Sequence, residues 1–281
     1  MRSGSKTTTK PPKGLKFLTN KTIPHLGDVE VWRKESTQTQ ILKKKITLET
    51  TSESDFDALK RLASMKHNNI IGINEIKKVT EKEYDVFFED VIDHDLLEEA
   101  RHRLERERRF SDREALEILQ QIASAIGYLH KNDTYHGEIT INTIYRDSNG
   151  KYQLLHPLFT IASNTKRLTE KKKKAQLAQS YKRDVENLGK TLLEAYFFPE
   201  PIHFPLKNPT EILKDRSLST ILEILLKLAN GQEKDTPDIF ALEKVLNSKE
   251  TQEKVERDDL EAKNKPIQKP LVSYSHVFWF S

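Results

Sequence analysis

Two histidines and one missing residue type limit the metal and nucleophile chemistry open to this chain. The sequence contains no Cys, which excludes disulfides, thiolate catalysis and zinc held by cysteine sulfur. His136 and His156 are too few for a zinc site, because zinc needs three or four protein ligands and the sequence shows no third ligand at a suitable spacing. We therefore predict no metal site, and we expect both imidazoles to pack and to form hydrogen bonds.

Two other groups of side chains have the chemistry to bind a partner. The first is a basic run at 165–176, whose centre is Lys171, Lys172, Lys173 and Lys174. Such a run is either a solvated loop or helix start, or a patch for an acidic protein, RNA or acidic phospholipid. The second is an aromatic group near the end of the chain, formed by Phe278, Trp279 and Phe280. It either docks on the chain's own domain or anchors a protein partner.

The first third of the chain has the periodicity of a small sheet with one helix. The stretch 16–46 contains three β-type segments, and the last of them places Leu42, Lys44 and Ile46 on one face. Residues 53–66 place apolar side chains at helical spacing and begin with acidic residues. A second strand pair is predicted at 73–79 and 84–91.

Beyond Asp95 the apolar spacing becomes helical. Ser111 is placed to cap the longest helical segment. The stretch 142–156 is typical of a hairpin with Asn149 and Gly150 in its turn. Helices are predicted at 96–108, 112–131, 183–197, 217–231 and 238–248. A strand-rich first third and a helical remainder together predict an α+β molecule with two lobes.

Composition narrows the function classes further. The 281 residues suit one large domain or two tightly joined lobes. There is no apolar run of about 18 residues that could span a bilayer, and the first residues lack the apolar stretch of a secretory signal. We therefore expect an intracellular, cytoplasmic protein that is not secreted. A net charge of +4 is weak support for a dedicated nucleic-acid binder.

Taken in order, the landmarks between Phe17 and Ser248 resemble the eukaryotic protein kinase family. The segments that carry the resemblance are Gly27-Asp28-Val29, Lys44, MKHNNII (65–71), VFFEDVIDHDL (86–96), the stretch 122–158 and RDVENLGKTLLEA (183–195). In the family these are the phosphate-covering loop, the strand lysine, the junction after helix C, the hinge, the catalytic region and helix F. The hinge would present Glu89 and Val91 to a nucleotide.

The resemblance implies a bilobal protein kinase-like fold, with a small β-rich N-lobe that contains helix C and a larger, mainly helical C-lobe. We expect a disordered basic arm over 1–15, an N-lobe over 16–90 and a C-lobe over 91–248. Residues 249–281 are assigned to a C-terminal tail, because the stretch 249–268 is charged and poor in apolar residues.

The nucleotide-binding positions implied by the resemblance are largely lost. Gly27 is the only glycine left of the three in the phosphate-covering loop, where glycines let backbone amides approach phosphate. Lys44 could still meet a phosphate, although its two lysine neighbours leave a shift of register open. Leu42 takes the place of the alanine over adenine and should crowd that pocket. Ala58 stands where helix C supplies the lysine's glutamate partner.

The catalytic positions implied by the resemblance have also changed. Glu138 stands for the catalytic base and keeps its basicity, but its longer side chain moves the carboxylate by roughly 1 Å. Thr140 replaces the lysine that neutralises the transferred phosphoryl group, and Thr143 replaces the metal-binding asparagine. His156 replaces the metal-binding aspartate, and imidazole is a poor ligand for Mg²⁺. By contrast, the resemblance implies that His136 and Asp184 keep structural roles.

The sequence therefore predicts a pseudokinase that acts as a protein-binding scaffold or allosteric regulator, with a protein partner such as an active kinase or its substrate. We expect no cofactor and do not expect Mg²⁺ to bind, while binding of ATP without metal is left open. Two alternatives remain. One is a divergent Ser/Thr kinase with weak activity that uses Glu138 as base. The other is a basic adaptor that binds nucleic acid or acidic membrane through 165–176.

Overall fold

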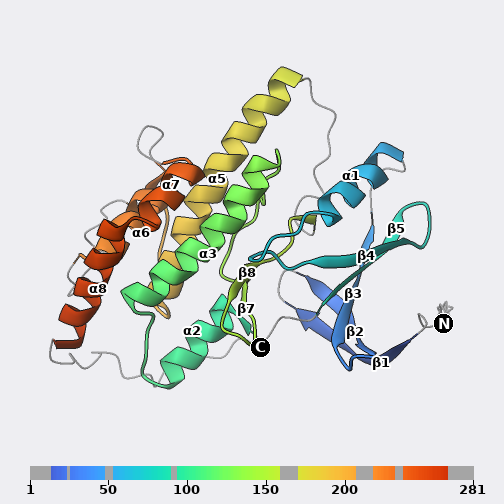
Figure 1. Ribbon diagram of the computed structural model, residues 1–281, viewed down its shortest axis with the longest axis horizontal. Coiled ribbons are helices and arrows are strands. Elements are labelled where there is room, and N and C mark those ends of the chain that lie inside the picture. The colour runs from blue at the N-terminus through green and yellow to red at the C-terminus, as the bar shows by residue number, and fades with distance from the viewer. Residues whose placement is uncertain are drawn as a thin grey trace.

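A computed structural model describes residues 14–23, 26–47, 53–89, 94–158, 170–206, 218–231 and 237–264. These residues form a sheet-rich lobe and a helical lobe, which lie side by side in Figure 1. The α+β architecture predicted from the sequence is confirmed. Among the described residues, no helix combines the length and the apolar character needed to cross a membrane.

The N-lobe is built on a five-stranded antiparallel sheet in the order β1-β2-β3-β5-β4. Its strands are β1 (Leu15–Ile23), β2 (Gly27–Lys34), β3 (Gln40–Thr47), β4 (Ile73–Lys78) and β5 (Glu83–Glu89). Helix α1 (Glu53–Ala63) packs beside β4. Phe56 of α1 stacks on Tyr84 of β5 with ring centroids 5.1 Å apart, and Leu59 is buried one turn later. The helical apolar spacing of 53–66 therefore faces the sheet.

The C-lobe is mainly helical and also carries a small sheet in the order β6-β7-β8. That sheet is formed by β6 (His94–Asp95), β7 (Ile144–Arg146) and β8 (Tyr152–Leu154). The helices are α2 (Leu96–Glu105), α3 (Asp112–Lys131), α5 (Glu170–Phe197), α6 (Thr220–Asn230), α7 (Ile239–Leu246) and α8 (Lys249–Asn264). Ser111 caps α3 in a capping box with Glu114, which confirms the predicted start of this helix.

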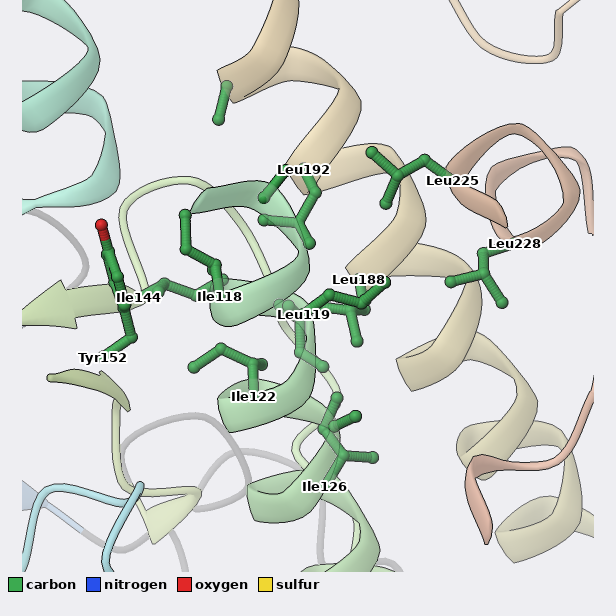
Figure 2. Packing of buried hydrophobic residues seen from close by; sticks show 14 of the residues in the cluster. Ile118, Leu119, Ile122, Ile126, Ile144, Tyr152, Leu188, Leu192, Leu225 and Leu228 are labelled. Atoms are coloured by element: carbon green, nitrogen blue, oxygen red, sulfur yellow. The ribbon is translucent and has the colours of Figure 1, made fainter. Parts of the chain in front are cut away.

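The C-lobe core lies between α3 and the two helices α5 and α6. Figure 2 shows α3 at its centre, with apolar side chains from α5 and α6 on one flank and from β7 and β8 on the other. The labelled residues are Ile118, Leu119, Ile122 and Ile126 of α3, Leu188 and Leu192 of α5, Leu225 and Leu228 of α6, Ile144 and Tyr152. Gly189 lets α5 approach α6 closely, because a Cβ there would lie 2.5 Å from the Leu228 Cβ.

Two helices differ from the sequence prediction. Helix α5 begins at Glu170 rather than at 183, and its N-terminal turns extend beyond the rest of the C-lobe in Figure 1. Residues 249–264, which the sequence analysis placed in a tail, form α8 instead. Val255 of α8 is buried in the C-lobe core. The tail prediction missed α8 because contacts with other elements, rather than local apolar periodicity, hold this helix.

Two adjacent carboxylates of α8 serve two different helices. An Oδ1 of Asp259 accepts hydrogen bonds from the backbone N–H of Asp112 at 3.0 Å and of Arg113 at 3.4 Å, at the start of α3. An Oδ2 of Asp258 accepts one from Thr220 N–H at 2.8 Å, at the start of α6. Because the first N–H groups of a helix lack partners within it, α8 supplies acceptors that both helices need.

Candidate active site

The segment that resembles the catalytic loop is anchored by one buried carboxylate on α5. Asp184 accepts hydrogen bonds from the backbone N–H groups of His136 and Gly137, both at 2.8 Å. Its Oδ2 also lies 3.1 Å from His130 Nε2, and Tyr181 stacks on the same imidazole at 3.9 Å between ring centroids. Asp184 therefore fixes the loop backbone at the place where the sequence analysis expected it to act.

The local backbone of the loop requires glycine at one position. Gly137 has a φ of +84°, and a Cβ added there would lie 3.2 Å from the ring of Tyr135. The turn leaves Glu138 exposed to solvent, and its backbone N–H donates to His136 Nδ1 at 3.3 Å. A carboxylate that stands for a catalytic base is thus present and accessible.

His136 is buried, and both of its ring nitrogens have partners. Its Nε2 lies 2.9 Å from the carbonyl oxygen of Leu155, while Nδ1 accepts the Glu138 N–H. Burial lowers the pKa of His136, even though Asp184 acts in the opposite direction. The ring is therefore a neutral imidazole that joins the catalytic loop to the residue after β8.

The hydroxyl of Thr143 is bonded to the backbone of Thr140 within the loop. Thr143 is fully buried, and its hydroxyl donates to the Thr140 carbonyl at 3.0 Å and accepts from the Thr140 N–H at 2.8 Å. The neighbouring Asn142 donates from Nδ2 to Asp95 Oδ2 at 2.9 Å. Neither side chain is arranged as a ligand for a metal ion.

His156 occupies the position of the metal-binding aspartate and is fully buried. Its Nδ1 accepts a hydrogen bond from the Leu158 N–H at 3.1 Å. Burial lowers the pKa of His156 to about 3, and the nearby His136 acts in the same direction. The carbonyls of Met65 and Leu62 lie near the ring and oppose the shift, but Nε2 forms no hydrogen bond of ordinary geometry. The ring is therefore neutral and turned into the protein.

Lys44, not Lys43, lies under the turn between β1 and β2. Leu42 and Lys44 share one face of β3, because side chains alternate along a strand. Lys43 lies on the other face, buried between Glu30 at 2.8 Å and Asp85 at 3.5 Å. Of these two adjacent lysines, Lys44 is thus the one whose ammonium reaches the β1–β2 turn.

The turn itself is closed by its own residues. Gly27 has a φ of +68°, and a Cβ there would lie 3.3 Å from the ammonium of Lys44. That ammonium donates to the Asp28 carbonyl at 3.3 Å, and the Thr22 hydroxyl donates to Asp28 Oδ1 at 2.7 Å. The lysine thus bonds to the loop that would cover a phosphate.

Several apolar residues at the junction of the lobes were not singled out from the sequence. Leu26, Leu155, Leu158 and Tyr145 are all buried in one cluster with Leu42. For Tyr145, the sequence offered one signal: it lies two residues after Thr143 in a β-type run. The others follow from tertiary contacts alone.

Several predicted site residues cannot be placed. Glu89 pairs through its backbone with Ile41 of β3, but its side chain and all of Val91 lie outside the described residues. The helix backbone includes Ala58 and the row of lysines at the start of α5, although their side chains are not described. The residues whose side chains or whole placement lie outside the description are Ala58, Lys171, Lys172, Lys173, Lys174, Phe278, Trp279 and Phe280. Within the described residues, no group of three His, Asp or Glu side chains is placed to hold a metal ion.

Comparison with known proteins identifies the family. The family model for protein tyrosine and serine/threonine kinases matches residues 20–181, which is more than half of the chain. The chain is also 34% identical over 107 residues to serine/threonine-protein kinase 33 of Bos taurus. That alignment covers 36% of this chain and 21% of the bovine protein. The fold, the order of the motifs and the family match agree, and the chain belongs to the protein kinase family.

Proposed function

We propose that this chain is a pseudokinase, a kinase-family protein that does not transfer phosphate and acts as a protein-binding scaffold or regulator. The observation that carries the proposal is the buried, neutral His156 at the position of the metal-binding aspartate. Mg²⁺ prefers oxygen ligands in octahedral geometry, whereas this position offers only the ring nitrogens of an imidazole, Nδ1 bonded to the Leu158 N–H and Nε2 buried. The residues present do not fit the metal that phosphoryl transfer needs.

The other changed positions act in the same direction. Thr143 uses its hydroxyl within the loop, so it does not replace the second metal ligand. Thr140 has no charge to stabilise the transferred group. An electrostatic stabiliser of this kind contributes about 10²–10³ in rate and a positioned base about 10²–10⁴. These factors do not multiply simply, but an exposed Glu138 alone leaves little catalysis.

A second candidate function is a weak Ser/Thr kinase. Two observations favour it: Glu138 is exposed at the position of the base, and the bovine relative is named a serine/threonine-protein kinase. This function would require a metal held by carboxylates other than those of the family motifs. The pseudokinase proposal predicts that no such metal is held.

A phosphate-transfer assay separates the two functions. The full chain, incubated with Mg²⁺-ATP or Mn²⁺-ATP and a generic protein acceptor, should transfer no more phosphate than its Glu138→Ala variant. A kinase of known activity in the same assay controls the conditions. Transfer by the wild-type chain that is lost in Glu138→Ala would establish the weak kinase and reject the pseudokinase. Transfer that is equal in both chains would come from a contaminating enzyme.

A further inference from the structure

A single apolar cluster crosses the junction between the two lobes. It includes residues of the N-lobe sheet and of the β1–β2 turn, together with residues of β7 and of the chain after β8. The members that meet at the junction are Ile23, Leu26, Val29, Leu42, Phe88, Tyr145, Leu155 and Leu158. Protein kinases place ATP in this region, under the phosphate-covering loop and beside the strand lysine.

Among the described residues, the apolar side chains of this cluster have almost no exposed surface. The exposed fraction is 0% for Leu42 and Phe88, which pair across β3 and β5, and 2% for Tyr145. Leu26, at the tip of the β1–β2 turn, is only 3% exposed. A cleft that waits for a planar ligand would leave the side chains on its two walls in water. Here the protein's own side chains cover them.

The phosphate side of the junction is filled in a similar way. The ammonium of Lys44 bonds to the Asp28 carbonyl and lies against Gly27, where phosphate oxygens would need space. The Asp28 carboxylate accepts from the Thr22 hydroxyl in the same turn and would repel a phosphate. The described polar groups at this turn, those of Thr22, Asp28 and Lys44, therefore bond to one another.

A second set of contacts joins the lobes behind this cluster. The Ile71 N–H donates to the Leu154 carbonyl at 3.0 Å, and the Leu154 N–H donates to the Asn69 carbonyl at 2.8 Å. The Asn69 amide also donates to the Tyr152 carbonyl at 2.8 Å. Backbone hydrogen bonds thus attach the segment before β4, in the N-lobe, to β8 in the C-lobe.

We propose that Leu26, Leu42 and Tyr145 form an internal plug that occupies the space an adenine nucleotide would need and holds the two lobes together without nucleotide. The inference rests on the proposed function, since a chain that transfers phosphate must admit ATP. It adds that partner binding by this chain does not respond to nucleotide. The two lobes are then held closed by the packing of these side chains in the folded chain and not by a bound nucleotide.

The first test uses the wild-type full chain in a thermal-shift titration. Adenosine, ATP alone and ATP with Mg²⁺ should each leave Tm unchanged within about 1 °C at millimolar concentration, because a ligand raises Tm only if it binds the folded chain. A saturable rise of several degrees with any of the three would overturn the plug. If that rise came without phosphate transfer, the pseudokinase function would still stand. Phosphate transfer would reject both proposals.

The second test removes the plug. The double variant Leu42→Ala, Tyr145→Ala should melt on the order of 10 °C or more below wild type, because it opens a cavity in a packed core. Adenine, which is flat and small enough for such a cavity, should then recover several degrees of Tm in this variant and none in wild type. Should the double variant fail to fold, Tyr145→Ala alone is titrated in the same way.

The control is Leu119→Ala, which makes the same truncation as the Leu42→Ala change but at a fully buried position of the C-lobe core. It should lose stability like the cleft variants, yet adenine should not recover it. Equal recovery in Leu119→Ala, or no recovery in any cleft variant that folds, would show that the side chains do not stand in for a nucleotide and would overturn the inference.

Discussion

The two sides of the catalytic loop differ in what they have kept. On the side that faces α5, Asp184 holds the His136 and Gly137 amides and contacts His130. On the side toward the junction between the lobes (the cleft side), a buried imidazole and two mutually bonded threonines stand at the positions that the family resemblance assigns to metal and phosphate. The first side determines where the backbone runs, whereas the second determines what the loop can do to a substrate.

The difference shows that the groups that anchor the loop backbone are separate from the groups at the catalytic positions. Buried backbone N–H groups must be bonded, so the loss of Asp184 would affect folding itself. Catalytic side chains are not required by the fold, and a bonded threonine or an apolar contact in their place is at least as stable. The chemistry of such a loop can therefore be lost while its geometry is kept.

The largest effect should come from the α5 side. Asp184→Ala removes the acceptor of two buried N–H groups and the partner of His130, so we expect it to lower the free energy of unfolding by about 3–5 kcal/mol. Urea unfolding measures this change. The matched control on the cleft side, Glu138→Ala, should cost less than about 1 kcal/mol because Glu138 is exposed. Similar costs for the two variants would contradict the division between the two sides.

An intermediate effect should appear on the cleft side as a dependence on pH. His156 has a pKa of about 3 when folded and about 6.5 when unfolded. The unfolded chain therefore binds more protons between these values, and stability falls as the pH drops below 6.5. The loss from His156 should reach about 2 kcal/mol at pH 5. The buried His136, whose pKa is also lowered, adds to it in the same direction.

Unfolding at pH 7 and pH 5 checks this prediction. His156→Leu should reduce the difference in unfolding free energy between the two pH values by about 2 kcal/mol. The control is His203→Leu, which changes an exposed histidine and should keep the wild-type difference. An unchanged pH difference in His156→Leu would mean that the ring is hydrated and not the neutral group described above.

The smallest effect on stability should come from α8, where a carboxylate accepts hydrogen bonds from the start of α3. Asp259→Ala removes the acceptor for two N–H groups at the start of α3 and should cost about 1 kcal/mol, as the loss of a helix cap does. Glu256→Ala, at an exposed position of the same helix, should change stability by less than about 0.5 kcal/mol. Equal costs would indicate that α8 does not stabilise α3.

Much of the fold could be predicted from local patterns. The cap at Ser111 and the turn at Gly150, which has a φ of +83°, follow from short-range chemistry and were found in the sequence. The start of α5 could not be found in this way, because its first turns carry charged and small residues without an apolar stripe. Its later anchor, the stack of Tyr181 on His130, joins residues far apart in the chain.

The candidate site divides along the same line. Motif spacing gave the positions of Glu138, Thr143 and His156, because these rest on the order of residues in one segment. The proposed plug could not be predicted from motif spacing, because Leu26 and Tyr145 join one cluster only when the two lobes pack together. Leu42 was the exception, because the family resemblance places an alanine at this position and the larger leucine predicted a crowded adenine pocket.

The unbroken length of α5 has a mechanical consequence. The helix runs for 28 residues, from Glu170 to Phe197, and Asp184 lies near its middle. At 1.5 Å per residue it is a beam about 40 Å long, fixed in the C-lobe core over its second half. A force on its N-terminal turns would be transmitted along the helix to Asp184, which accepts hydrogen bonds from two amides of the catalytic loop.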